Sequence, residues 1–250
     1  MGSAGEAGPV LADFMAAVGA VLPLAALWAH GSLALGDYQP GRSDLDLVAL
    51  IEAAPAPGQE HDLARMHEAL QARQPLADKL HCSYVVRAQA GDPGRDHLTW
   101  AHRQLFERPV SPVTRRELHQ GGVALLGPAP ATVIPAVSDA ELADFVRADL
   151  RDFWYPHTAM DDIWREDIWV DLGLLTFARA AVTLRDGRLI TKRAALDVLA
   201  DMQAPPGVVR DIYQRRYADP APITPQWRES RGELARAYLR ARIPGLTGPR

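Results

Sequence analysis

Two aspartates separated by one residue are the part of the sequence best suited to chemistry. Asp44 and Asp46 open the run DLDLVALI, residues 44–51, whose apolar end predicts a strand. Side chains at positions i and i+2 of a strand point to the same face, so the two carboxylates should project together. Their mutual repulsion disfavours ionisation of both, and a divalent cation such as Mg²⁺ removes that repulsion. The spacing therefore predicts a Mg²⁺ site.

A Gly-Ser turn precedes these aspartates by eleven residues. Residues 24–29 form a short apolar run typical of a buried strand, and Gly31 and Ser32 follow it. Glycine lets the backbone approach a ligand closely, and backbone N–H groups beside a hydroxyl can hold phosphate oxygens. One loop thus offers donors to a polyphosphate, and the next strand offers acceptors to its metal. Together they predict a site that orients a nucleoside triphosphate.

The elements around this site predict an α/β domain. Apolar residues at helical spacing indicate a helix over 10–22, and a second helix is expected over 60–73. Strands are expected over 24–29, 44–51 and 80–88. The order helix, strand, turn, strand, helix, strand is typical of an α/β fold with flanking helices.

The sequence changes character after a proline-rich stretch at 108–136, which has an irregular pattern and one short apolar run. No strand is predicted beyond about residue 135, and five segments suit helices: 139–155, 167–185, 191–202, 205–217 and 226–242. We therefore expect two domains. Residues 1–136 form the α/β domain with a mixed sheet, and residues 137–250 form an all-α helical bundle.

Composition restricts the classes of partner and location. The net charge of −4 argues against a nucleic-acid surface, and the one cysteine, Cys82, excludes a disulfide within the chain and a cysteine-based zinc site. The apolar segment 14–29 is too short to span a bilayer and contains Pro23. We expect a cytoplasmic monomer that does not associate with membranes.

The motif HGSLALGDYQPGRSDLDLVAL, residues 30–50, resembles that of the streptomycin/spectinomycin adenylyltransferases, which belong to the polymerase-β-like nucleotidyltransferase superfamily. The segment VALLGP at 123–128 is similar to one near the end of their catalytic domain. A third segment, 174–199, is similar to a helix pair of their C-terminal domain. In that family the pair carries Leu-Thr-x-x-Arg, then about seven residues, then Gly-x-Ile-x-x-Lys. The matching residues here are Leu175, Thr176, Arg179, Gly187, Leu189 and Lys192.

This resemblance implies a nucleotidyltransferase that uses ATP and Mg²⁺ to transfer AMP to a hydroxyl of a small molecule. An aminoglycoside such as streptomycin or spectinomycin is the expected acceptor, which would make the chain an antibiotic-resistance protein. The helical domain would complete the substrate and nucleotide cleft. The implied site residues are Asp44 and Asp46 for Mg²⁺, Gly31, Ser32 and Ser43 for phosphate, and Lys192 for the phosphates from the helical domain.

One position departs from the family pattern. The third strand of these enzymes carries a glutamate that acts as general base, and the run LHCSYVVR places His81 there. Three interpretations remain open. His81 is the base, since neutral imidazole can accept a proton near pH 7; the base comes from elsewhere; or the protein binds nucleotide without efficient transfer.

The acceptor site rests on weaker patterns. Trp100 lies where the family stacks a tryptophan on its substrate. The acidic segment DDIWREDIWVD, residues 161–171, would attract a polycationic aminoglycoside, with Glu166, Asp167 and Asp171 as binding residues and Asp162 as a further candidate. A packing tryptophan and a solvated helix start are the competing interpretations.

Two other functions compete with this one. The same scaffold could modify a protein or RNA, although RNA binding usually needs a basic surface. Alternatively the protein is a nucleotide-binding regulatory module or a weakly active homologue, which the missing carboxylate base would explain.

Overall fold

The computed structural model describes residues 3–220 and 222–248. The chain divides into two compact units, Met1–Val137 and Ser138–Arg250. This division lies one residue from the boundary predicted between residues 136 and 137.

The first unit is built on a six-stranded mixed sheet in the order β5-β4-β3-β2-β1-β6. The strands are β1 Leu24–Ala29, β2 Leu45–Ile51, β3 Leu80–Val86, β4 Asp96–Ala101, β5 Gln104–Pro109 and β6 Val123–Leu126. Among the strands of the described residues, only β2 and β3 pair in parallel. Helix α3, Pro57–Arg73, makes the crossover that this pairing requires. The predicted mixed sheet with flanking helices is confirmed.

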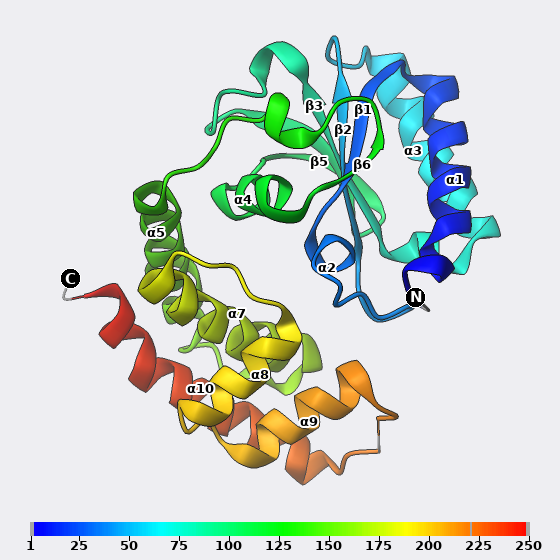
Figure 1. The fold of residues 1–250 in the computed structure, drawn as a ribbon. Helices are drawn as coiled ribbons and strands as arrows, with labels where there is room; N and C mark the ends of the chain where they lie inside the picture. Colours follow the sequence, from blue (N-terminus) through cyan, green and yellow to red (C-terminus); the bar gives the residue numbers. More distant parts are fainter. Residues whose placement is uncertain (1–2, 221, 249–250) are drawn as a thin grey trace. The chain divides into compact units, whose positions relative to one another are not determined.

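Helices cover both faces of the sheet, as Figure 1 shows. Helix α1, Ser3–Val21, and α3 pack on one face, and α4, Pro112–Gly121, packs on the other. The remaining short elements are α2 Gly31–Ala34, η1 Pro75–Lys79, η2 Arg87–Gln89 and η3 Pro130–Thr132.

The alternation of β2 determines which face receives the predicted site. Leu45 and Leu47 belong to the core beneath α1 and α3, whereas Val48 belongs to the core beneath α4. Since successive side chains alternate, Asp46 lies on the face that α4 covers. The two predicted metal ligands therefore emerge at one end of the α4 face.

The hairpin β4–β5 and helix α4 were not predicted from the sequence. The hairpin turns at His102 and Arg103, whose φ angles of 52° and 64° are both positive. Such two-residue turns usually carry Asn or Gly. Neither residue is present here, so the sequence gives no hairpin signal. Helix α4 begins after Ser111, whose Oγ accepts the Thr114 N–H at 3.2 Å, so Ser-Pro in the proline-rich stretch marks a helix start.

The described part of the second unit contains helices and no strand, which confirms the helical prediction. Its elements are α5 Asp139–Ala148, η4 Asp149–Trp154, α6 Tyr155–His157, η5 Asp162–Arg165, α7 Asp167–Asp186, α8 Lys192–Asp201, α9 Pro206–Tyr217 and α10 Pro225–Thr247. Helix α7 supplies much of the core and packs against α8 and α10. Across the described residues, no helix has the length and apolarity that crossing a membrane requires.

A buried histidine sits in the core between the sheet and α3. His67 is 1% exposed, its Nε2 is hydrogen-bonded to the Tyr84 hydroxyl at 2.7 Å, and its ring stacks on Trp100 at 4.5 Å between centroids. Burial lowers the pKa of His67 to about 3, so the ring stays neutral in the folded protein.

Acid should therefore destabilise the protein through His67. The unfolded ring has a pKa near 6.5, so below that pH the unfolded state binds a proton that the folded state does not. The stability is complete above about pH 6.5 and falls as the pH drops toward 3, by about 2 kcal/mol at pH 5. Urea unfolding at pH 7 and pH 5 measures the change.

The variant His67→Gln should lose most of this pH dependence, because glutamine does not titrate. His61→Gln, which alters an exposed histidine of the same helix, is the control and should keep it. Equal pH dependence in the two variants would contradict the assignment to His67.

Candidate functional site

The centre of the site is a close approach between Gly31 and Asp46. Gly31 follows β1 with a φ of +61°, and a Cβ at this position would lie 2.6 Å from Asp46 Oδ2. A side chain here would displace the Asp46 carboxylate, and the positive φ also favours glycine. The predicted phosphate turn therefore lies directly against one of the predicted metal ligands.

Charged groups from neighbouring elements flank the two aspartates. Asp44 and Asp46 keep side-chain exposures of 38% and 30%, so both carboxylates reach solvent. Lys79 Nζ lies 3.9 Å from Asp44 Oδ1. His81, the partner of Asp46 in the parallel β2–β3 pair, has its Nδ1 3.7 Å from Asp46 Oδ1. The structure thus brings His81 beside Asp46, the predicted metal ligand, as its place in the sequence predicts.

The two serines predicted to contact phosphate occupy different surroundings. Ser43 is 2% exposed, and its Oγ accepts the Gln39 N–H at 3.1 Å, which braces the loop before β2. Ser32 is half-buried in the turn, and its carbonyl accepts the Asp37 N–H at 2.9 Å. Both serines therefore shape the loops around the aspartates, and their contact with phosphate stays a prediction.

Sequence reasoning missed a buried ion pair behind the turn. His30 Nδ1 lies 2.9 Å from Glu117 Oε2, with side-chain exposures of 12% and 9%. Burial lowers the pKa of His30, but the Glu117 hydrogen bond and the charges of Asp46 and Glu117 outweigh it, so the pKa is raised overall. His30 could have been found from the sequence, because it directly precedes the Gly31-Ser32 turn. Glu117 could not, because it lies on α4, a helix that the sequence did not predict.

Trp100 has a packing role in this structure. It is 1% exposed, its ring stacks on His67, and its strand neighbour Cys82 belongs to the same core. No face of the ring is open to an acceptor, because the side chain alternates onto the α1 and α3 side of β4. The stacking contact predicted from the family pattern therefore has no support here.

Lys192 is the first residue of α8 in the helical unit, after the N-cap Thr191. Arg179 of α7 donates from Nε to the Ile190 carbonyl at 3.0 Å and so fixes the segment that leads into Lys192. The family-like pattern that includes Arg179 and Lys192 thus has a local structural basis. Contact of Lys192 with a nucleotide stays a prediction.

The carboxylates predicted to bind the acceptor are largely engaged by arginines of their own unit. Asp171 is buried and accepts from Arg215 Nε at 3.2 Å, and Asp167 pairs with the fully buried Arg231. Burial raises the pKa of Asp171 despite Arg215, whereas at Asp167 the arginines outweigh burial and the pKa is lowered. Asp171 is therefore not a rim residue, while Glu166 is exposed before α7.

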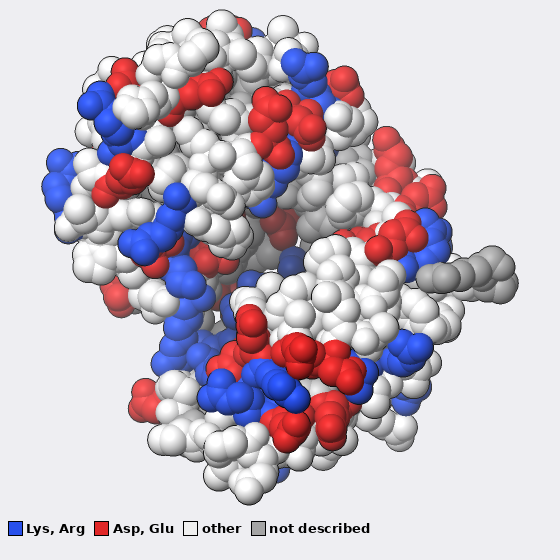
Figure 2. Space-filling model, turned by 180° about the vertical axis from the view of Figure 1, so that it is seen from behind, with Lys and Arg blue, Asp and Glu red and all other residues white. Residues whose placement is uncertain are grey.

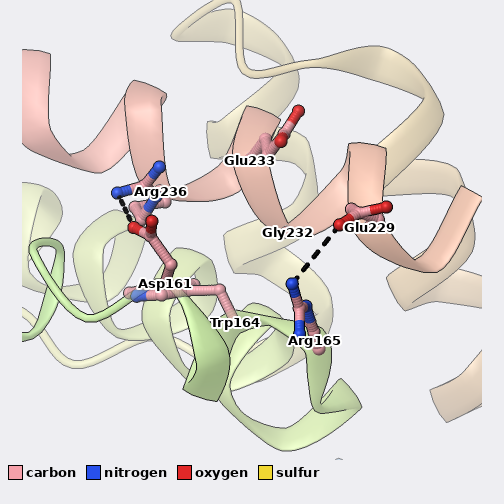
Figure 3. A pocket seen from close by; sticks show the side chains of 7 residues that line it. All are labelled: Asp161, Trp164, Arg165, Glu229, Gly232, Glu233 and Arg236. Atoms are coloured by element: carbon pink, nitrogen blue, oxygen red, sulfur yellow. Dashed lines mark hydrogen bonds and ion pairs between the residues drawn. The ribbon is translucent and has the colours of Figure 1, made fainter. Parts of the chain in front are cut away.

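Two cavities lie beside this acidic segment. The one in Figure 3 is about 80 Å³, room for a few waters but not for a sugar. Arg236 pairs across it with Asp161, and Arg165 Nη2 lies 3.4 Å from Glu229 Oε1. A second cavity of about 340 Å³ has Asp167 in its wall and reaches the size of a small-molecule pocket.

The carboxylates suit a metal that arrives with a nucleotide. In the described residues, no group of three or more His, Cys, Asp or Glu side chains is arranged to hold a metal ion. Mg²⁺ typically takes one or two carboxylates and completes its shell with phosphate oxygens and water. Asp44 and Asp46 provide that number, and both side chains reach solvent, where phosphate oxygens and water could complete the shell.

The fold has a counterpart of known structure. The chain matches spectinomycin adenyltransferase AAD(9) from Enterococcus faecialis, whose structure was determined with ATP and spectinomycin. The TM-score is 0.72 over 94% of this chain and 98% of that one, with 13% identical residues. The resemblance to aminoglycoside adenylyltransferases is thus confirmed as a likeness of fold. No family model and no curated protein sequence matches the chain.

The contact between Gly31 and Asp46 can be tested with a matched pair of glycine variants. Gly31→Ala introduces a methyl group that collides with the carboxylate, whereas Gly36→Ala has the same positive φ strain with open space around it. Each should lose about 1 kcal/mol or more of unfolding free energy from the strained backbone. Only Gly31→Ala should also weaken binding of ATP with Mg²⁺, by about tenfold or more. Calorimetric titration measures this, and equal affinities of the two variants would contradict the assignment.

Proposed function

We propose that this protein is a nucleotidyltransferase that transfers AMP from ATP to a hydroxyl of a small molecule, with an aminoglycoside such as streptomycin or spectinomycin as the acceptor. The observation that carries the proposal is the Gly31 turn packed against Asp46, because the predicted phosphate-binding turn lies beside a predicted metal ligand. The likeness of fold to a spectinomycin adenyltransferase supports it.

Each residue of the site has a separate role in the proposed reaction. Backbone N–H groups at Gly31 and Ser32 would hold the phosphates. Asp44 and Asp46 would hold Mg²⁺, which would supply positive charge to stabilise the departing pyrophosphate. The acceptor oxygen forms a bond to the α-phosphorus as the bond to pyrophosphate breaks. The hydroxyl proton would go to His81, whose Nδ1 lies 3.7 Å from Asp46 Oδ1.

Small acceptors fit the surface charge better than RNA does. Acidic and basic side chains are interspersed over the face shown in Figure 2. An RNA substrate calls for a contiguous basic surface. A cationic small molecule instead needs a few local carboxylates, and Glu166 and Asp162 are exposed in the predicted acidic segment.

A nucleotide-binding module without transfer is the second candidate, and the histidine beside Asp46 favours it. A mass-spectrometric screen separates the two. Incubation with ATP, Mg²⁺ and a panel of aminoglycosides should add the mass of one AMP to at least one compound. Binding of ATP with no product from any acceptor would support the module instead.

Asp46→Asn should reduce transfer by at least about 100-fold, because the amide cannot replace the carboxylate as a metal ligand. Removal of Mg²⁺ by a chelator should have a similar effect on the unmodified protein. Asp62→Asn alters an exposed aspartate on α3 and should keep full activity. Full activity of Asp46→Asn would rule out the metal assignment.

His81→Gln should reduce the turnover number by about 10² to 10⁴-fold if His81 accepts the proton, while ATP affinity stays within a few fold. Unchanged transfer by His81→Gln would show that the base comes from another residue.

A further inference from the structure

The buried pair of His30 and Glu117 is not used by the chemistry proposed above. It lies on the sheet face whose core contains Trp28, Val48 and Leu118, an apolar setting for a carboxylate. Burial of an ion pair is costly in such a setting, so the pair is weak evidence for stability alone. A role in positioning gives it a physical reason.

The backbone connects His30 to both halves of the site. Its N–H donates to the Asp46 carbonyl at 3.0 Å, and the next residue is Gly31, which lies against the Asp46 carboxylate. His30 is extended, with φ −137° and ψ −160°, and its side chain makes no capping bond to the turn. The orientation of its ring therefore depends on Glu117.

Glu117 is presented by a firmly anchored helix. Arg115, two residues earlier, is buried and donates to the carbonyls of Val110 at 3.1 Å, Ala90 at 3.0 Å and Asp92 at 2.8 Å. At the end of α4, a Cβ on Gly121 would lie 3.5 Å from the Ala34 carbonyl at the end of α2. Helix α4 thus provides a fixed support beside the turn.

We propose that Glu117 is a positioning residue for the nucleotide phosphates: by holding the His30 ring, it keeps the Gly31–Ser32 turn seated against Asp46. The inference rests on the proposed function, since it concerns the same phosphate cradle. Loss of Glu117 leaves His30 without the acceptor at 2.9 Å, and the turn samples other positions. The effect should therefore fall on nucleotide binding rather than on the acceptor.

Calorimetric titration of the full chain with ATP and Mg²⁺ tests the proposal. Glu117→Ala should bind about tenfold more weakly than the unmodified chain, as expected for loss of a hydrogen bond to a charged group. His30→Ala should show a similar loss. The double variant should bind no more weakly than either single one, because Glu117 acts through His30. Gln120→Ala, on the exposed side of α4, is the control and should bind normally.

Two conservative variants separate positioning from a general structural role. Glu117→Gln keeps an oxygen at the same reach and should bind within about threefold of the unmodified chain, whereas Glu117→Asp is one methylene shorter and should bind about tenfold more weakly. The Michaelis constant for ATP should rise in Glu117→Asp while that for the acceptor stays unchanged. Near-normal ATP binding by Glu117→Gln together with weaker binding by Glu117→Asp would support the positioning role even if Glu117→Ala does not fold.

The outcomes that overturn the proposal are distinct. Normal ATP binding by Glu117→Asp and Glu117→Ala removes the positioning role and leaves the proposed function intact. Additive losses in the double variant show that Glu117 does not act through His30. Absence of ATP binding by the unmodified chain defeats the proposed function, and this inference with it.

Discussion

The site depends on one steric constraint, the absence of a side chain at Gly31. Because a Cβ there would lie 2.6 Å from Asp46 Oδ2, the Asp46 carboxylate can keep its position beside the end of β1 only with glycine at residue 31. The antiparallel pairing of these strands brings His30 opposite Asp46, where a backbone hydrogen bond of 3.0 Å closes the ladder. The close approach places the backbone of the predicted phosphate-binding turn beside a predicted metal ligand, as the proposed function requires.

The parallel pairing of β2 with β3 adds the third component. It sets His81 directly beside Asp46 and on the same face of the sheet. A glutamate at this position would strengthen a metal site, whereas an imidazole adds a proton acceptor without adding negative charge. In the proposed function, His81 would therefore supply the proton acceptor without adding a third carboxylate to the proposed metal site.

The strands and the aspartates were predictable because their signals are local. The alternation of acidic and apolar residues at the start of DLDLVALI predicts a strand, and the glycine after β1 predicts a turn. Both patterns depend only on residues that are neighbours in the sequence. The hairpin at His102 and Arg103 was not predictable, because its two positive φ angles are carried by residues that rarely adopt them. Glu117 could not be assigned for a different reason: its partner His30 lies 87 residues away, and no spacing rule connects a helix to the end of a strand that far apart.

The acidic segment of the helical unit shows why charge in a sequence is a weak guide to ligands. Five acidic residues against one basic residue over 161–171 predict a surface that attracts cations. In the fold, Arg215 of α9 forms an ion pair with Asp171, and Arg231 of α10 forms one with Asp167. A buried carboxylate must be paired, so Asp171 is the least available of these residues to a ligand, whereas the Asp167 side chain stays 47% exposed beside its arginine. Recognition of a cationic acceptor would therefore fall to exposed carboxylates such as Glu166.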